Sequence, residues 1–129
     1  MMIDSNIIIY AAQPKFRMLR KFVREHEPAV SAVSVVEVLG YHRLDQRDKG
    51  FFENFFKSTE VLPVSDEVIG RAVRLRQNRK MDLADALIAG TATVFGHTLA
   101  TRNVRHFAGI QGLKVLDPFT SSEGAQQSH

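Results

Sequence analysis

Three acidic residues stand in unusually apolar stretches of the chain. Asp4 lies between Met-Met-Ile and a run of three isoleucines, Glu37 lies within Val-Val-Glu-Val-Leu, and Asp85 lies within Leu-Ala-Asp-Ala-Leu-Ile. An ionised carboxylate in apolar surroundings is costly unless a cation pairs with it. Because no Lys or Arg occurs within four residues of any of them, local helical ion pairs do not supply that cation.

A divalent ion shared by the three acids would supply the cation that pairs with them. Each acid falls at or just after an expected strand end, where parallel α/β sheets form their ligand crevices. Carboxylates that converge there repel one another and raise their pKa values unless a cation intervenes. The chain has no cysteine and no paired-histidine spacing, so a hard ion with oxygen ligands is the natural candidate. We therefore expect one acidic pocket formed by Asp4, Glu37 and Asp85.

Each acid also has a structural interpretation. Asp4 fits the N-cap of a following helix, and Glu37 fits an exposed stripe of its own helix. Asp82 and Asp85 have the spacing of a capping box, which suits Asp82 better because the box normally ends in Glu or Gln. Three such coincidences together are a weaker explanation than one shared pocket.

The elements that must position these acids follow from the hydrophobic pattern. Short apolar runs predict strands at residues 1–3, 29–32, 61–64, 98–101 and 113–116. Helical periodicity or capping predicts helices over 14–26, from Ser34, around 51–56, after Ser65 and from Asp82 to Phe95. Strands that alternate with helices predict an α/β fold with a parallel sheet covered on both faces.

Length and composition predict one ordinary globular domain. The 129 residues are 44% hydrophobic and 24% charged, and 17 basic minus 14 acidic side chains give a net charge of +3, too mild to indicate nucleic-acid binding by itself. The absence of cysteine excludes thiol catalysis and disulfides. No apolar run is long enough for a membrane span, and no secretory signal is evident. We expect a cytoplasmic domain over residues 1–118 and a flexible tail over 119–129.

Four ordered blocks of the sequence resemble those of a known family. They read Ile-Asp-Ser-Asn-Ile-Ile-Ile-Tyr (3–10), Ser-Val-Val-Glu-Val-Leu-Gly (34–40), Leu-Ala-Asp-Ala-Leu-Ile-Ala-Gly-Thr-Ala (83–92) and Leu-Ala-Thr-Arg-Asn-Val-Arg-His-Phe (99–107). Together they resemble the PIN domain, and more narrowly the VapC toxins of bacterial type II toxin–antitoxin pairs. Ile-Gln-Gly-Leu-Lys-Val (110–115) is similar to the family's usual end.

The resemblance implies a three-layer α/β/α fold with a short-stranded parallel sheet, and a Mg²⁺- or Mn²⁺-dependent endoribonuclease. It also implies that Asp4, Glu37 and Asp85 bind the metal. The family often has a fourth acid where this chain has Asn103, which accepts hydrogen bonds but supplies no charge. This departure puts a tightly held second metal in doubt, although Asp82 is close enough to add charge at the rim.

Other residues in or near the blocks are candidates for contacts with water or phosphate. Ser5, Asn6 and Thr101 lie beside the acids, with helix capping or loop packing as the alternative. Arg102 and Arg105 are expected to contact RNA phosphates. Basic stretches at 15–24 and 71–80 suit RNA or a solvated helix face equally, whereas His106 is interpreted as structural.

The resemblance also implies partners: an RNA substrate, a VapB-type antitoxin whose C-terminal segment covers the site, a homodimer and a toxin–antitoxin hetero-oligomer, with no membrane. A stripe of Phe51, Phe52, Phe55 and Phe56 is expected in the core, with a dimer seam or an antitoxin groove as alternatives. The alternative function is a non-catalytic RNA-binding or interaction module with the same fold and a site weakened at Asn103.

Overall fold

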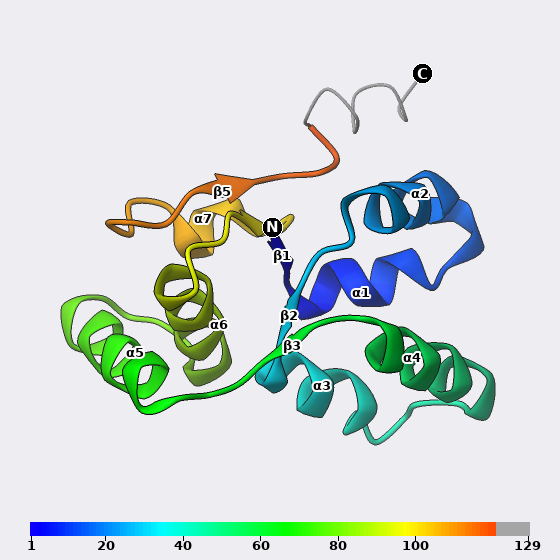
Figure 1. Ribbon diagram of the computed structural model, residues 1–129, viewed down its shortest axis with the longest axis horizontal. Helices are drawn as coiled ribbons and strands as arrows, with labels where there is room; N and C mark the ends of the chain where they lie inside the picture. The colour runs from blue at the N-terminus through cyan, green and yellow to red at the C-terminus, as the bar shows by residue number, and fades with distance from the viewer. Residues whose placement is uncertain (121–129) are drawn as a thin grey trace.

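The computed structural model describes residues 1–120, in which short strands alternate with helices (Figure 1). The strands are β1 (Met2–Ile3), β2 (Val30–Ser31), β3 (Val61–Leu62), β4 (Leu99–Ala100) and β5 (Val115–Leu116). The helices are α1 (Ser5–Ala11), the 3₁₀ helix η1 (Pro14–Phe16), α2 (Arg17–His26), α3 (Ala32–Leu39), α4 (Gln46–Ser58), α5 (Asp66–Asn78), α6 (Leu83–Val94) and α7 (Val104–Phe107). Most of the expected tail, residues 121–129, lies outside the described residues.

All strand pairs are parallel, as the sequence predicts. β1 pairs with β4, β4 pairs with β5, and β2 pairs with β3, while an isolated bridge between Met2 and Ala29 joins the two groups. The resulting order is β3–β2–β1–β4–β5, with the chain running outward from β1 in both directions. The strand order therefore reverses at β1, and ligand crevices of open α/β sheets form at the carboxyl ends of strands beside such a point.

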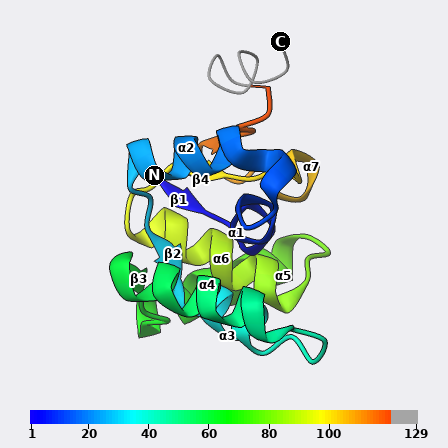
Figure 2. The ribbon, with the colours of Figure 1, turned by 90° about the vertical axis from the view of Figure 1, so that its right-hand side faces the viewer.

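Neighbouring strand residues point to opposite faces of the sheet, and each face has its own core. Met2 and Leu99 pack with side chains of α5, α6 and α7, whereas Ile3 and Ala100 pack with side chains of α1, α2 and α4. This alternation is the two-residue period of a strand. Figure 2 shows β1 running through the middle of the molecule. The three-layer α/β/α architecture is confirmed.

The helices α5 and α6 approach closely at Gly90. A Cβ atom added there would lie 3.0 Å from the carbonyl oxygen of Val68, which is tighter than ordinary contact. Val68 and Ala89 are fully buried beside this contact. Glycine therefore sets the spacing of the two helices that form one outer layer.

The phenylalanine stripe of α4 faces the core in part. Phe52 is buried, while the other three are half-buried and pack against the same core. Phe51 and Phe55 also line an open cavity of about 300 Å³ with Ile8 and Val23. The core interpretation is thus confirmed for Phe52.

The last described residues return to the start of the chain. The Phe119 ring packs edge-to-face against Tyr10 and Phe16, with ring centroids 6.0 and 5.6 Å away. The expected domain boundary at residue 118 stays a prediction, although Phe119 adds a ring to the α1 side of the molecule. Within residues 1–120, every helix is too short or too polar to cross a membrane.

Candidate active site

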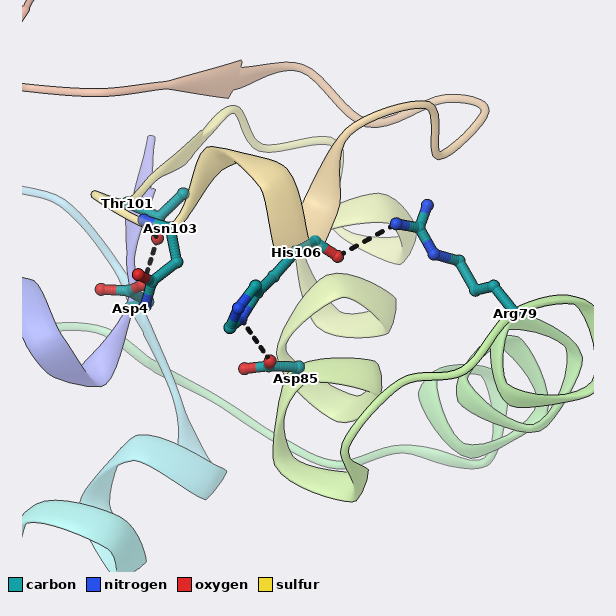
Figure 3. A network of polar contacts seen from close by, with 6 residues as sticks. All are labelled: Asp4, Arg79, Asp85, Thr101, Asn103 and His106. Carbon is teal, nitrogen blue, oxygen red and sulfur yellow. Dashed lines mark hydrogen bonds and ion pairs between the residues drawn. The ribbon is translucent and has the colours of Figure 1, made fainter.

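Asp4 occupies the junction between β1 and α1. Its Oδ1 accepts a hydrogen bond from the backbone N–H of Ile7 (3.0 Å), which makes Asp4 the N-cap of α1. Its Oδ2 accepts a short hydrogen bond from the hydroxyl of Thr101, which follows the neighbouring strand β4 (Figure 3). Asp4 is only 4% exposed. The helix-capping interpretation is therefore correct, and it coexists with a position at the switch point of the sheet.

The pKa of Asp4 reflects its burial, its hydrogen bonds and the two other acids. Burial raises the pKa of this carboxyl above its ordinary value of 3.8, and the hydrogen bonds from Thr101 and Ile7 oppose that rise. The negative charges of Asp85 and Glu37 raise the pKa further. Nearby carboxylates repel one another in this way, and the meeting of all three around one ion stays a prediction.

Glu37 reaches this region from α3, the helix after β2. Its Oε1 accepts a 2.6 Å hydrogen bond from Ser5 Oγ, and Ser5 Oγ is also hydrogen-bonded to Ser34 Oγ at 2.9 Å. Ser34 is fully buried, whereas Glu37 is solvent-exposed. The exposed-stripe interpretation of Glu37 is therefore correct, and it coexists with the hydrogen bond from Ser5.

Asp85 projects from the first turn of α6, and its side chain is 26% exposed. Its Oδ2 lies 3.2 Å from Nδ1 of His106 (Figure 3). Asp82 stands at the N-cap of the same helix, but its side chain makes no capping hydrogen bond. The capping-box interpretation is thus wrong, and Asp85 contacts His106 instead of its own helix end.

The remaining candidates take different positions. The backbone N–H of Asn103 donates to Thr101 Oγ1 (3.0 Å), while Asn6 is exposed on α1. The guanidinium of Arg102 lies over the rings of Phe119 and Tyr10, 4.1 and 5.3 Å from their centroids. Arg105 lines an open cavity of about 260 Å³ that also includes Lys80, Asp82, Asp85 and His106.

Several arginines of the two basic stretches bind backbone carbonyls. Arg20 donates to the carbonyls of Ala11 and Ala12, and Arg71 donates to that of Gln111. Arg20 and Arg71, which the sequence alone offers as RNA contacts, thus bind backbone carbonyls of the protein itself. Part of each basic stretch therefore forms hydrogen bonds that join one structural element to another.

The oxygen atoms of Asp4, Glu37 and Asp85 suit a hard divalent ion. Within residues 1–120, neither Asp4 nor Glu37 forms an ion pair with Lys or Arg. No group of three or more His, Asp or Glu side chains in that range closes into a preformed metal cage. Mg²⁺ usually keeps several waters and binds through one or two carboxylates. The donor chemistry therefore fits an ion held partly through water.

Sequence reasoning missed Ser34 and the contact of His106, which it interpreted as structural. Ser34 precedes Glu37 by one helical turn, so its spacing places it on the same helix face. His106 lies 21 positions from Asp85, and no local pattern indicates their contact.

Comparisons with known proteins identify the family of the chain. The PIN domain family model matches residues 1–113. Ribonuclease VapC1 of Rickettsia felis is 29% identical over 127 residues, covering 90% of this chain and 94% of that protein. The tRNA(fMet)-specific endonuclease VapC of Shigella flexneri is 26% identical over 126 residues, covering 90% and 96%.

A solved structure gives the same result. A toxin–antitoxin complex from Klebsiella pneumoniae contains a chain that is 28% identical and superposes with a TM-score of 0.75, covering 91% of this chain and 96% of that one. The predicted resemblance is confirmed: the chain belongs to the PIN domain family, and its relatives there include VapC ribonucleases.

Proposed function

We propose that the chain is a divalent-metal-dependent endoribonuclease that acts as the toxin of a toxin–antitoxin pair. The observation that carries the proposal is the position of Asp4, which is buried where β1 ends beside the switch point and is followed by Ser5, whose hydroxyl donates to Glu37. Membership of the PIN family and similarity to VapC ribonucleases support RNA as the substrate. The name of the Shigella flexneri relative supports a structured RNA such as tRNA.

The side chains take distinct roles in this proposal. Asp4, Glu37 and Asp85 hold a Mg²⁺ or Mn²⁺ ion, whose chemistry is the activation of water and the neutralisation of phosphate charge. Thr101 holds Asp4, and Ser5 holds Glu37. Hydrolysis by water leaves a 5′-phosphate and a 3′-hydroxyl, and it does not use the RNA 2′-hydroxyl.

Phosphate contacts are proposed on the Asp85 side of the site. Arg105 and Lys80 share the open cavity with Asp85, and their positive charges attract the RNA backbone there. Arg102 is better placed to stack than to bind phosphate, because two aromatic rings lie against its guanidinium. Asn103 and Asn6 stay proposed accessory groups for water.

The proposal includes partners and location. The Klebsiella pneumoniae structure is a toxin–antitoxin complex, which supports an antitoxin partner of the VapB type for this chain. We also propose a homodimer within the hetero-oligomer, and a cytoplasmic location where structured RNAs are available.

The test uses purified protein with a tRNA mixture, in Mg²⁺ or in EDTA. Wild type is expected to cleave only with the ion, and Asp4→Asn and Asp85→Asn are expected to remove cleavage. Asp66→Asn, an acid in the first turn of α5, is the matched control and is expected to cleave normally. A 2′-deoxy substitution at the cut site is expected to leave cleavage intact.

Two outcomes would contradict the proposal. Cleavage that persists in EDTA or in both site variants would exclude the metal mechanism. RNA binding by wild type without cleavage in any divalent ion would favour the non-catalytic module with a site weakened at Asn103.

A further inference from the structure

The helix α7 connects the two sides of the acidic site. Asn103 at its N-terminal end is bonded to Thr101, whose hydroxyl donates to Asp4. His106 in its last turn contacts Asp85. Figure 3 shows the Thr101–Asp4 contact beside the start of this short helix and the His106–Asp85 contact beneath it. The position of α7 therefore affects both carboxylates.

A helix of four residues does not hold itself in place. Helices this short have too few internal hydrogen bonds to be stable in isolation, so contacts with the rest of the protein must fix α7. Phe107 supplies one such contact, since its side chain is 1% exposed and packs in the core beneath α5 and α6. That contact fixes the buried side of the helix and leaves its outer side to polar groups.

Arg79 supplies the polar contact that holds the C-terminal end of α7, called the Arg79 tie below. It follows α5 directly, and its guanidinium donates from Nη1 to the carbonyl of Ala108 (2.6 Å) and from Nη2 to that of His106 (3.3 Å). Carbonyls at a helix C-terminus lack partners within the helix, and a cation is favourable at that end. One side chain thus binds two carbonyls at the end of α7 that carries the imidazole.

His106 connects the end of α7 that Arg79 holds to Asp85. An ionised carboxylate only accepts hydrogen bonds, so Nδ1 of the imidazole carries the hydrogen that points to Asp85 Oδ2. This bond occupies one oxygen of Asp85. It also limits rotation of a side chain that is otherwise 26% exposed.

We propose that Arg79 and His106 are positioning residues for Asp85. The guanidinium fixes the C-terminal end of α7, and the imidazole held there orients the carboxylate toward the acidic site. The inference deepens the proposed nuclease function and rests on it for its effect on catalysis. Residues that orient metal-binding side chains in this way commonly change metal affinity or activity by about 10–100-fold when replaced.

The experiment compares single and double variants of the full chain. His106→Ala removes the donor, whereas His106→Asn keeps an N–H donor near the place of Nδ1. Arg79→Ala removes both carbonyl bonds, and Arg74→Ala is the matched control, an exposed arginine of α5. Mn²⁺ affinity is measured by calorimetry on the protein alone, and kcat and KM are measured on a short RNA.

His106→Ala is expected to weaken Mn²⁺ binding and lower kcat by about tenfold each, with KM nearly unchanged and substantial rescue in His106→Asn. Arg79→Ala is expected to change the same quantities in the same direction. Because both residues act on Asp85 in series, the double variant is expected to be no worse than His106→Ala alone. Additive effects in the double variant would overturn the proposal, because the two residues would then act independently. A raised KM with unchanged kcat in Arg79→Ala would also overturn it, because Arg79 would then be a phosphate contact.

A measurement without metal or RNA separates this inference from the nuclease proposal. Imidazole ¹⁵N signals of the metal-free protein at one fixed pH report the hydrogen bond at Nδ1. Arg79→Ala is expected to shift the His106 signals, and Arg74→Ala is expected to leave them unchanged. Unchanged signals in Arg79→Ala would refute the tie even in an active nuclease, and a shift would support it even if wild type cleaves no RNA.

Discussion

Replacement of Asp4 tests whether its carboxylate opposes folding in the absence of metal. Asp4→Asn removes a buried charge that two other acids repel, so the metal-free protein is expected to melt at a higher temperature than wild type. The amide oxygen of Asn caps α1 as well as Asp does, and its NH2 group, which is only a donor, can donate to the hydroxyl oxygen of Thr101 in a bond of reversed direction. Asp4→Ala removes the charge as well, but it also loses the capping bond to Ile7 and the bond to Thr101.

The two lost bonds set the difference in unfolding free energy between Asp4→Ala and Asp4→Asn. A helix N-cap contributes about 1 kcal/mol, and a further hydrogen bond contributes about 1 kcal/mol. Asp4→Ala is therefore expected to be less stable than Asp4→Asn by about 2 kcal/mol. For a domain of this length, 1 kcal/mol changes the melting temperature by about 3–4 °C, so the two variants are expected to melt about 7 °C apart.

The pH dependence of the Asp4→Asn effect has a definite sign. The folded-state pKa of Asp4 is raised above 3.8, so the folded state binds this proton more tightly than the unfolded chain does. Wild type therefore loses stability as the pH rises from about 3.8 through the raised pKa. The advantage of Asp4→Asn is expected to be absent at the acidic end of that window and complete above it.

Thermal scans in EDTA and in saturating Mn²⁺ provide the assay. Mn²⁺ is expected to raise the melting temperature of wild type, since a ligand that binds only the folded state stabilises it, and to leave Asp4→Asn unchanged. A lower metal-free melting temperature for Asp4→Asn than for wild type would refute the charge argument. Equal stabilisation of both proteins by Mn²⁺ would refute the assignment of Asp4 as a ligand.

Three further predictions concern packing and the site. Gly90→Ala is expected to lower the melting temperature, because its Cβ would meet a carbonyl of α5 at 3.0 Å, whereas Gly50→Ala in open space is expected to raise it by better helix propensity. Phe119→Ala is expected to destabilise the fold by about 2 kcal/mol, since two ring contacts and one cation–π contact are lost; urea denaturation measures this, and an unchanged midpoint would contradict it. Ser5→Ala is expected to reduce Mn²⁺ affinity in calorimetry by freeing Glu37, and unchanged affinity would show that the hydroxyl does not orient that carboxylate.

Local sequence patterns predicted the strands and the acids at their ends. The expected strands at residues 1–3 and 98–101 contain β1 and β4, which place Asp4 and Thr101 side by side. These predictions succeed because an apolar run that ends abruptly in a polar residue marks the end of a buried strand. Such a pattern is complete within a few residues, so it needs no knowledge of the rest of the chain.

Contacts between distant segments could not be predicted in the same way. Arg79 and Arg105 both lie in basic surroundings, yet Arg79 binds two backbone carbonyls and Arg105 lines the open cavity. Their difference depends on where α7 comes to lie relative to α5. The bond from Ser5 to Glu37 has a similar origin, because it joins residues 32 positions apart on two different helices.

The bond between Asp4 and Thr101 joins residues 97 positions apart, and this separation affects when the site can exist. During synthesis the first acid is made at the outset, but the strand that completes its surroundings follows only near the end. At about 5–20 residues per second, a ribosome works for about 5–20 seconds between the two. A chain that stops before β4 therefore carries its first acid without the hydroxyl that holds that carboxylate in the complete fold.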